Sequence, residues 1–397
     1  MTLLRAETSV VKIAYVTTVA LSVRLLFLNQ LRDLQRCGFD VTAISAGGDD
    51  LDAIRAAGIR HLTVPFTRRM SPLADLLVTW RLWRLFRRER FTIVHTHQPK
   101  PGLFAQIAAR LAGVPIVVNT VHGFLFTDRS PAAVRRLWVT TERIASSCSD
   151  RLLCVSAEDA VTSVRERISP PERVVAIGGG IDIQRFSRAA VNAGRVAELR
   201  REFGVEPGQL VIGFVGRLVR EKGINELLDA FRLVRQQCPK AILLFVGPTD
   251  PDKRDAMRPE AMLASDVGQG LRFAGYRHDM PDLYALMDVF ALPSHREGLP
   301  QTLMEAAAME LPAVTTDVRG CREVTVHGET GFVVPHRDVA ALSSTLLRLL
   351  QDAELRACIG RRARARALAL YDERALSERL RDVYASLLGV RRSVDVA

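Results

Sequence analysis

The sequence of 397 residues contains few cysteines, and they follow no metal-binding or disulfide pattern. No C-x-x-C occurs, and the six cysteines are scattered, at Cys37, Cys148, Cys154, Cys238, Cys321 and Cys358. This absence argues against a zinc site and a disulfide framework, and it fits a reducing cytoplasm.

Long apolar segments are also missing. No run of about 18 apolar residues exists, so no membrane span is expected. A strand-like VVKIAYV begins at Val10 with no cleavage pattern after it, so we expect no secretory signal. The composition, 48% hydrophobic and 25% charged, is typical of a globular protein. A chain of this length exceeds one ordinary core, which predicts two domains.

The net charge of +11 is unevenly distributed. Residues 1–180 carry 24 Lys and Arg against 15 Asp and Glu, whereas residues 181–397 carry 31 against 29. A basic first half suggests an anionic partner, such as a lipid surface, a phosphate-bearing substrate or nucleic acid. The alternative is an arginine-rich protein with solvated faces.

Short β-branched segments alternate with stretches of helical spacing throughout the chain. The strand candidates are residues 12–16, 40–45, 61–64, 91–95, 115–120, 151–156 and 173–177, then 210–215, 241–246, 271–275, 288–293, 312–316 and 331–334. Such alternation predicts parallel sheets with helices on both faces. Gly178–Gly180 indicates a linker between two doubly wound α/β domains, 1–180 and 181–372. We expect residues 373–397 to form a helix that returns to the first domain.

Two segments of the second half place charged residues where a strand meets a helix. In GFVGRLVREKGINELLDAF the chain turns at Gly216, and Arg217 and Lys222 lie before a helix that begins near Ile224. A helix N-terminus favours anions, so two cations there predict a diphosphate site. The alternative is that both are solvent-exposed loop charges.

The segment REGLPQTLMEAAAMELPAV has the same layout. Glu297 lies in the loop, Pro300 suits a first helical position, and Glu305 projects from the second turn. Gln301 and Thr302 would offer free amide N–H groups. The alternative for each glutamate is a solvated charge, since a carboxylate near a helix N-terminus is mildly stabilising by itself.

Together these segments resemble the retaining glycosyltransferases of family 4. The resemblance rests on GRLVREKG, on the two glutamates that enclose seven residues, and on VHTHQPKPGLFAQIAARLAGVPIVVNTVHG and YRHDMPDLYALMDVFALPSHREGLPQTLMEA. It covers nearly the whole chain and is greatest for bacterial enzymes of lipid-linked surface polysaccharide or O-antigen assembly. It implies the GT-B fold, in which two facing Rossmann-like domains hold a nucleotide-sugar in an interdomain cleft.

The resemblance also implies roles for individual residues. The residue matching Glu297 holds hydroxyls of the donor sugar, and the one matching Glu305 holds the ribose. Arg217 and Lys222 would stabilise the leaving phosphates. The remaining donor contacts are expected from the turn, the helix start and the base-side segment, at Gly216, Gly298, Leu299, Gln301, Thr302, Tyr276 and Arg277.

The sequence departs from the family pattern at two places. Most members have Glu-Gly-Phe-Gly where this chain has EGLP, and Pro300 lacks an N–H, so phosphate contacts should shift to Gln301 and Thr302. The loop after the first strand is usually glycine-rich, but here it is TTVALSVR. This points to Ser22 and Arg24 in place of a backbone phosphate cradle.

Histidines follow two predicted strands of the first half, in HTHQPK and TVHG. His122 matches the family histidine that contacts the donor sugar near its reacting carbon. We expect only one of His95 and His97 to face the cleft. A metal site would need a third ligand, and none is evident.

Two Asp-x-Asp patterns raise the same question of a metal. Asp50 and Asp52 are explained by capping of a helix, and Asp250 and Asp252 lie in a loop. No metal or other cofactor is expected.

Residues 71–91 form a helical pattern with an apolar face and a basic end. The apolar positions are Leu73, Leu76, Leu77, Trp80 and Trp83, and the basic positions are Arg81, Arg84, Arg87 and Arg88. This helix is either an ordinary domain helix with a basic outer surface or a docking site for anionic lipid.

The resemblance, together with these features, implies a retaining, metal-independent glycosyltransferase that uses a nucleotide-sugar, expected to be a UDP-sugar. The acceptor is expected to be a polyprenyl-diphosphate-linked saccharide held by Ser22, Arg24, His97 and Lys100. The enzyme would be cytoplasmic and peripheral on the inner face of the plasma membrane. The alternatives are a sugar-nucleotide 2-epimerase of the same fold and a non-catalytic basic membrane-binding protein. No RNA-binding motif is visible, so no nucleic-acid partner is expected.

Overall fold

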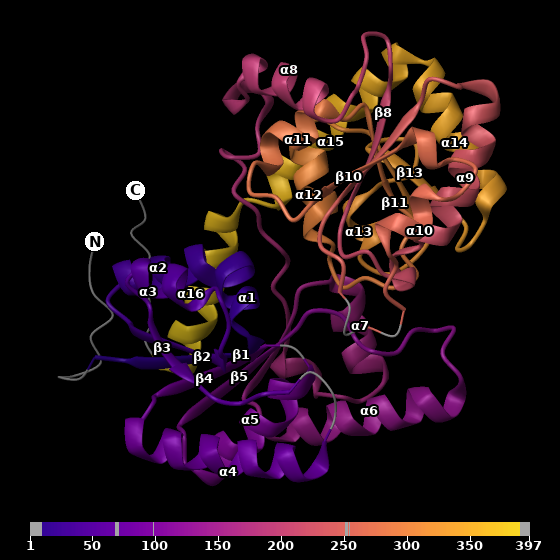
Figure 1. The fold of residues 1–397 in the computed structure, drawn as a ribbon. Coiled ribbons are helices and arrows are strands. Elements are labelled where there is room, and N and C mark those ends of the chain that lie inside the picture. The colour runs from indigo at the N-terminus through magenta and orange to yellow at the C-terminus, as the bar shows by residue number, and fades with distance from the viewer. Residues whose placement is uncertain (1–9, 68–70, 98, 251–252, 254, 390–397) are drawn as a thin grey trace, which may run out of the picture. The chain divides into compact units, whose positions relative to one another are not determined.

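The computed structural model describes residues 10–67, 71–97, 99–250, 253 and 255–389. The chain divides into two compact units, Met1–Gly178 with Arg374–Ala397, and Gly179–Glu373. Each unit contains one parallel β-sheet with helices around it (Figure 1). The predicted α/β class is therefore confirmed, and the two units are described in turn.

The sheet of the first unit has seven strands in the order β3-β2-β1-β4-β5-β6-β7. All seven predicted strands are present: β1 Lys12–Val19, β2 Asp40–Ala46, β3 Arg60–Thr63, β4 Ile93–His97, β5 Ile116–Val121, β6 Arg151–Cys154 and β7 Val174–Ala176. The strand order reverses between β1 and β4. In wound sheets of this kind, ligands bind outside the carboxyl ends of the strands at such a switch point.

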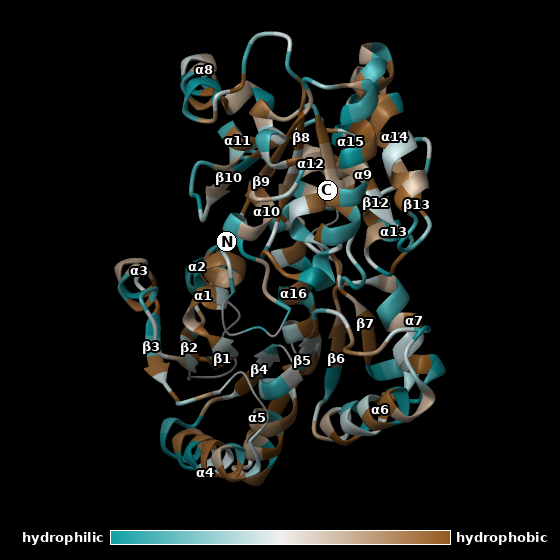
Figure 2. Ribbon diagram, turned by 45° about the vertical axis from the view of Figure 1, so that its right-hand side comes forward, coloured by the Kyte–Doolittle hydropathy of each residue, from teal (hydrophilic) through white to brown (hydrophobic). Residues whose placement is uncertain are grey.

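The inner strands β1, β2, β4 and β5 of this sheet are buried on both faces. In β1, Ile13 and Tyr15 belong to one apolar cluster, and Ala14 and Val16 belong to another. Because alternate residues of a strand point to opposite faces, the sheet lies between two helical layers. Figure 2 shows β6 and β7 of the same sheet in the colour of hydrophobic residues.

Helices on the two faces supply the rest of these clusters. The helical elements of the unit are α1 Ala20–Ser22, the π-helix η1 Val23–Phe27, α2 Leu28–Arg36, α3 Leu51–Ala56, α4 Pro72–Glu89, α5 Pro99–Leu111, α6 Ala132–Ser147, α7 Ala157–Arg165, the 3₁₀ helix η2 Pro171–Arg173 and α16 Glu373–Leu387. Helix α4 contributes Val78, Leu82 and Phe86 to the cluster of Ala14.

Helix α16 comes from the end of the chain but belongs to the core of the first unit. Leu380 and Tyr384 are fully buried in the cluster that contains Tyr15. Arg381 forms an ion pair with Asp33 of α2. The first unit therefore needs the last helix of the chain to complete one face of its sheet.

The sheet of the second unit has six strands in the order β10-β9-β8-β11-β12-β13. All six predicted strands are present: β8 Val211–Val215, β9 Ile242–Val246, β10 Leu271–Gly275, β11 Val289–Leu292, β12 Ala313–Thr316 and β13 Gly331–Val334. Its α-helices are α8 Ala193–Glu202, α9 Ile224–Gln237, α10 Pro259–Leu263, α11 Met280–Leu286, α12 Gln301–Ala308, α13 Cys321–Val324, α14 Val339–Gln351 and α15 Ala353–Leu370. The strand order reverses between β8 and β11, which places the ends of these two strands at the expected ligand-binding position.

Candidate functional site

The loops that follow β8 and β11 meet at this switch point of the second unit. Lys222 lies in a short 3₁₀ turn, η4 Arg220–Lys222, and its Nζ is 2.5 Å from Oε1 of Glu297. Ser294 Oγ donates to the same oxygen over 2.7 Å. The sequence predicted both charged residues as site residues, but it did not predict their contact or the role of Ser294.

Three glycines without a predicted role set the approach of these loops. Gly223 has a φ of 72°, and a Cβ there would lie 1.9 Å from the carbonyl oxygen of Pro293. Gly320 has a φ of 75°, and a Cβ there would lie 1.7 Å from the carbonyl oxygen of Gly298. Gly247 has a φ of 138°, and a Cβ there would lie 2.0 Å from the carbonyl oxygen of Gly216. Only glycine permits contacts this close.

Arg217 follows Gly216 and forms an ion pair with Asp250, with Nη1 and Oδ2 3.0 Å apart. The Asp250 carboxylate is buried, whereas the Arg217 side chain is 42% exposed. Asp250 therefore supports the arginine while leaving part of the guanidinium accessible. Asp252, the second residue of the predicted pattern, lies outside the described residues.

Helix α12 begins one residue later than predicted. Pro300 is its N-cap, with a φ of −71° and a ψ of 110°, so Gln301 is the first helical residue. Within the described chain, the amide N–H groups of Gln301 and Thr302 have no hydrogen-bond partner. Leu299 packs against Gly179, where a Cβ would lie 2.6 Å from Leu299 Cδ2. The helix start thus offers two donors to an anion, as predicted from the sequence.

Glu305 lies one turn further along α12 and is buried. The hydroxyl of Tyr284, in α11, donates to Glu305 Oε2 over 2.8 Å. Burial raises the pKa of Glu305 to about 7, because a charged carboxylate loses its hydration. Tyr284 orients this glutamate and has no sequence motif that would have identified it.

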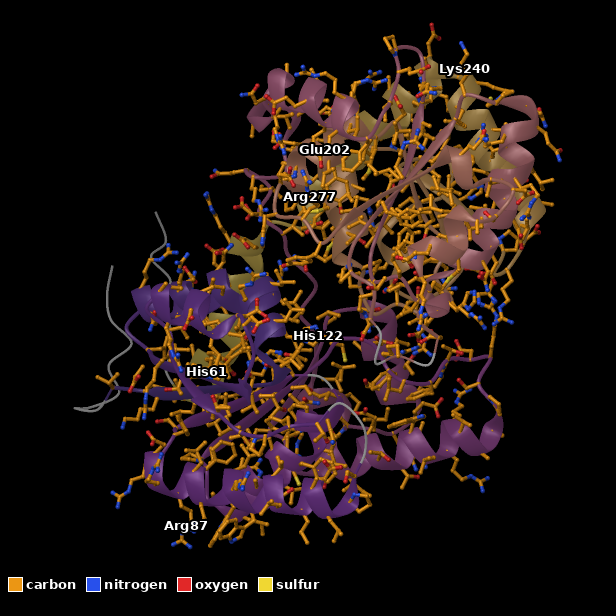
Figure 3. The ribbon with its side chains drawn as sticks, viewed as in Figure 1. His61, Arg87, His122, Glu202, Lys240 and Arg277 are labelled. Carbon is orange, nitrogen blue, oxygen red and sulfur yellow. The ribbon has the colours of Figure 1, made fainter. Side chains whose placement is uncertain are left out.

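Tyr276 and Arg277 follow β10, at the same edge of the sheet. Tyr276 is 42% exposed. Arg277 donates to Asp279 over 2.6 Å and to Glu202 over 2.7 Å (Figure 3). Two carboxylates already bind Arg277. Beside the base of a bound nucleotide, Arg277 would therefore hold the segment after β10 in place rather than offer the base a free charge.

The switch point of the first unit holds a cluster of three histidines. His95 and His97, both in β4, have ring centroids only 4.2 Å apart. The expectation that only one of them could face the ligand side was wrong, because residues i and i+2 of a strand point to the same face. His97 Nδ1 lies 3.1 Å from Nε2 of His122, which follows β5.

The other contacts of this cluster come from buried polar and aromatic groups. His95 is bonded through Nδ1 to the Tyr384 hydroxyl (2.6 Å) and through Nε2 to Thr120 Oγ1 (2.7 Å). Burial lowers the pKa of His95 to about 3 and that of His122 to about 4, so both rings are neutral near pH 7. Within the described residues, no His, Cys, Asp or Glu side chains form a group of three or more that could hold a metal ion.

The predicted loop over residues 17–24 is not a loop. Strand β1 continues to Val19, α1 begins at Ala20, and Ser22 and Arg24 are therefore helical. Arg24 Nε lies 2.6 Å from Oδ1 of Asp50. Asp50 occupies the N-cap position of α3 without a side-chain capping bond, so its predicted capping role is corrected to an ion pair.

Lys100 was predicted to present a charge to an acceptor diphosphate, and the structure contradicts this. It lies in the first turn of α5, is 7% exposed, and its Nζ is 2.6 Å from Oδ1 of the buried Asp75. It also donates to the carbonyl oxygen and the hydroxyl of Thr67. The Lys100 ammonium is therefore held in a buried ion pair between α5 and α4.

Helix α4 exposes four of the five apolar residues that the sequence pattern singled out, whereas Trp83 is partly buried against the core. Its buried face consists of Asp75, Val78, Leu82 and Phe86. Leu73 is 85% exposed and Trp80 is 47% exposed, with Leu76 and Leu77 exposed beside them. The exposed arginines are Arg81, Arg84, Arg87 and Arg88, and Figure 3 shows Arg87 pointing away from the sheet. We call these eight exposed residues the α4 surface.

The α4 surface also contains a shallow pocket lined by Trp80, Arg81, Arg84, Leu85 and Arg88. The guanidinium of Arg84 lies 4.9 Å from the ring centroid of Trp80, a cation–π contact. None of the described helices is both long enough and apolar enough to cross a membrane.

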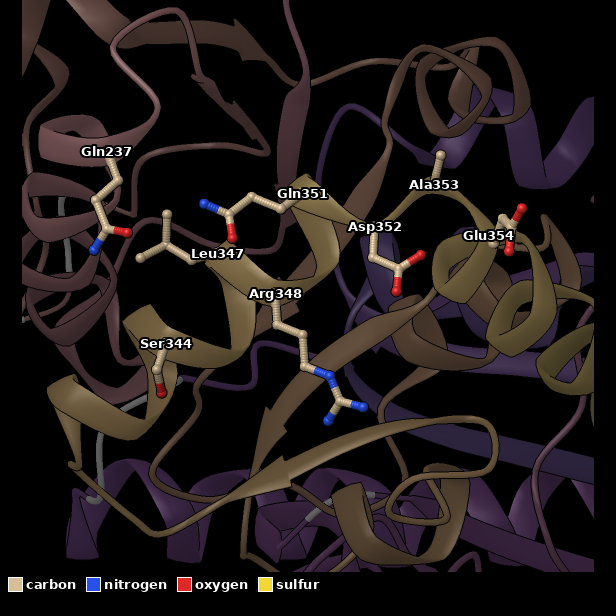
Figure 4. Close-up of a pocket in the computed structure, with 8 residues that line it drawn as sticks. All are labelled: Gln237, Ser344, Leu347, Arg348, Gln351, Asp352, Ala353 and Glu354. Atoms are coloured by element: carbon tan, nitrogen blue, oxygen red, sulfur yellow. The ribbon is translucent and has the colours of Figure 1, made fainter.

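A second shallow pocket lies in the second unit, around the junction of α14 and α15. It is lined by Gln237, Ser344, Leu347, Arg348, Gln351, Asp352, Ala353 and Glu354 (Figure 4). None of these residues belongs to the predicted site, and Asp352 caps α15 by accepting from Leu355 N. We assign this pocket no role.

Two family models match successive parts of the chain. One, described as Glycosyltransferase Family 4, matches residues 26–185, and the other, described as Glycosyl transferases group 1, matches residues 196–366. The two matches include the histidine cluster and the Lys222–Glu297 loops, respectively.

Similar proteins include bacterial sugar transferases. An Escherichia coli UDP-Gal:alpha-D-GlcNAc-diphosphoundecaprenol alpha-1,3-galactosyltransferase is 29% identical over 88% of this chain and 90% of its own. A GDP-mannose-dependent alpha-mannosyltransferase of Mycobacterium tuberculosis is 30% identical, covering 77% of this chain and 78% of its own. The crystal structure of Anabaena Alr3699/HepE in complex with UDP and glucose has a TM-score of 0.79 at 19% identity, covering 95% of this chain and 100% of the other.

Proposed function

The chain belongs to the family 4, group 1 glycosyltransferases of the GT-B fold, and on this premise we propose a specific reaction for it. It transfers a sugar, with retention of configuration, from a UDP-sugar to a lipid-linked saccharide acceptor in surface polysaccharide synthesis. The observation that carries this proposal is the cation–carboxylate pair of Lys222 and Glu297, adjacent in sequence to a helix start with two unpaired amides.

These groups suit the two ends of a nucleotide diphosphate sugar. Lys222 and Arg217 supply positive charge for the diphosphate, and the amides of Gln301 and Thr302 supply hydrogen bonds to it. Glu297 accepts from hydroxyls of the sugar, and Glu305 accepts from the ribose. Tyr276 and Arg277 lie beside the base.

The chemistry requires stabilisation of the leaving group. As the glycosidic C–O bond breaks, its electron pair passes to the diphosphate, whose negative charge grows. Fixed cations and helix N–H groups stabilise this charge most strongly in the transition state.

The acceptor hydroxyl attacks from the same face of the sugar and loses its proton to a phosphate oxygen of the donor. We assign no protein nucleophile and no metal. His122 contacts the sugar near the reacting carbon, in its neutral form.

The acceptor is proposed from the name of a relative and from chemistry. The E. coli relative acts on an undecaprenol-diphosphate-linked sugar, as its name states. A substrate with a polyprenyl tail lies in a membrane, and the α4 surface combines exposed leucines and Trp80 with four arginines. We propose that this surface docks on anionic lipid, because apolar side chains enter the interface while cations pair with headgroups.

The direct test of the proposed function is product analysis. The purified protein would be incubated with a panel of UDP- and GDP-sugars and with polyprenyl-diphosphate sugars, and the products would be identified by mass spectrometry and anomeric NMR. A glycosylated lipid with the donor's anomeric configuration is expected. Conversion of the donor to its 2-epimer without an acceptor would instead identify an epimerase.

A further inference from the structure

The contact between His97 and His122 involves one ring nitrogen of each residue. His97 Nδ1 and His122 Nε2 are 3.1 Å apart, and burial lowers the pKa of both rings well below the usual range. A neutral imidazole has one ring N–H and one acceptor nitrogen. In this hydrogen bond, therefore, one of the two nitrogens donates and the other accepts. The direction of that bond determines which nitrogen of His122 keeps a hydrogen for other contacts.

The surroundings of His97 discriminate between the two directions. Its Nε2 is buried and has no hydrogen-bond partner within the described residues. If His122 donated, His97 would carry its hydrogen on Nε2, and a buried N–H would have no acceptor. If His97 donates from Nδ1, its Nε2 is an unprotonated nitrogen in an apolar setting. Buried N–H groups without a partner are rarer than unpaired acceptors, which favours donation by His97.

The position of the His97 ring is fixed by aromatic neighbours. Its centroid lies 4.3 Å from that of Tyr15 and 4.3 Å from that of Phe27. His97 is 1% exposed, whereas His122 is half-buried. Within the described chain, His122 Nδ1 has no hydrogen-bond partner. His97 is thus held rigidly, and His122 keeps one nitrogen for a ligand.

We infer that His97 is a positioning residue that fixes the tautomer of His122, so that His122 presents Nδ1–H as a donor to an oxygen of the donor sugar. The sugar contact rests on the proposed function, whereas the tautomer follows from the geometry of the first unit. Through this bond His97 sets which sugar atoms His122 can recognise: an oxygen that accepts is bound, and a group that can only donate is rejected.

The tautomer can be measured by NMR without any substrate. Two-bond ¹H–¹⁵N correlation of the full-length protein labelled with ¹⁵N-histidine distinguishes Nδ1–H from Nε2–H rings, and His122→Asn identifies the His122 signals. The wild type should show His122 with Nδ1 protonated. In His97→Phe, which keeps the ring but loses the donor, His122 should become a mixture of both tautomers.

Two further variants separate this role from general packing. His97→Asn places an amide near the former Nδ1 position and should restore the Nδ1–H form of His122. Tyr384→Phe removes the hydroxyl that bonds to His95 but leaves the His97–His122 pair intact, so the His122 spectrum should not change. An Nε2–H form of His122 in the wild type, or an unchanged spectrum in His97→Phe, would overturn the inference.

Kinetics test the link to the sugar separately. His97→Phe should lower kcat roughly 10-fold, the scale of one hydrogen bond made in the transition state, and His97→Asn should recover most of the loss. The KM for the donor should change much less. If His122→Phe, which removes the Nδ1–H donor, keeps wild-type turnover, the proposed sugar contact fails, and the spectra still decide the tautomer. If the contact stands but His97→Phe keeps wild-type kcat, the inference is refuted.

Discussion

Lys222 and Glu297 lie in loops from two adjacent strands, with Nζ and Oε1 2.5 Å apart. The cation proposed for the diphosphate therefore neutralises the carboxylate proposed for the sugar while no donor is bound. Neither charge is fully solvated, since the two side chains are 19% and 9% exposed. The removal of one leaves the other partly buried and unpaired, which makes this pair sensitive to single substitutions.

Lys222→Ala should reduce kcat by about 10²–10³, the cost of losing one stabiliser of developing charge. Glu297→Gln should reduce kcat by roughly 10–100-fold, which corresponds to about 1.5–3 kcal/mol for a hydrogen bond to a charged group. Steady-state kinetics with a fixed acceptor measure both effects. Arg296→Gln, which removes the adjacent ion pair with Glu221, is the control and should stay within about twofold. Wild-type turnover in both site variants would refute the assignment of the pair.

The affinity for UDP should increase as pH rises through about 7, the pKa of Glu305. A raised pKa means that Glu305 is largely protonated below this value, and only the ionised form accepts from both ribose hydroxyls. Calorimetric titration with UDP between pH 6 and pH 8 measures the dependence. Glu305→Gln should bind UDP more weakly at pH 8 and show a shallower profile over this range, since only the terminal phosphate of UDP, with a second pKa of about 6, then titrates. A profile in Glu305→Gln as steep as that of the wild type would assign the titration to another group.

Arg217→Ala should lower kcat by about 10²–10³ if the guanidinium acts on the leaving diphosphate. Since we assign charge stabilisation to side chains and helix N–H groups, activity should survive dialysis against EDTA. Loss of activity with EDTA that magnesium or manganese restores would refute the metal-free mechanism. Asp250→Asn removes the ion-pair partner of Arg217 but keeps the guanidinium. It should therefore lower kcat less than Arg217→Ala does.

Lys100→Met should destabilise the first unit by about 3–5 kcal/mol, because it leaves Asp75 as an unpaired buried charge. Urea unfolding followed by circular dichroism measures the change in the free energy of unfolding. The double variant Lys100→Met with Asp75→Asn should recover part of the loss. If Lys100→Met is as stable as the wild type, the buried ion pair contributes little to stability.

Replacement of Arg84, Arg87 and Arg88 by glutamate should weaken binding to anionic vesicles, since each basic residue near such a surface contributes about 1 kcal/mol. Co-sedimentation with phosphatidylglycerol vesicles at low salt measures this. Trp80→Ser tests the apolar part of the α4 surface. Arg195, Arg200 and Arg201 of α8 lie outside this surface, and their replacement by glutamate is a matched control for charge. Equal sedimentation of the wild type and the α4 variant would identify this surface as an ordinary solvated face.

The strands were predictable because a buried parallel sheet requires continuous β-branched and apolar segments, such as IVVNTV and ILLFV. The loop charges at Lys222 and Glu297 were predictable for a related reason, since the ends of strands next to a switch point are fixed by topology. Gly320 was not predictable, because its constraint is contact with Gly298, which is distant in sequence.

Lys100 and α4 show why side-chain environments are harder to predict than elements. HTHQPK gives no sign that Asp75, 25 residues earlier, lies within ion-pair distance of Lys100. Helical spacing likewise identified an apolar face on α4. The core, however, uses the adjacent face with Val78, Leu82 and Phe86, and leaves Leu73 and Leu76 in solvent.

The return of α16 to the first unit has a consequence for synthesis on the ribosome. Domains of a growing chain ordinarily fold in order from the N-terminus as each emerges. Here the first unit lacks Leu380 and Tyr384 until the whole of Gly179–Glu373 has been translated. A nascent first unit therefore has one face of its sheet only partly covered until α16 has been synthesised, while the second unit folds. A stop codon before α16 would consequently damage the half of the protein that was made first.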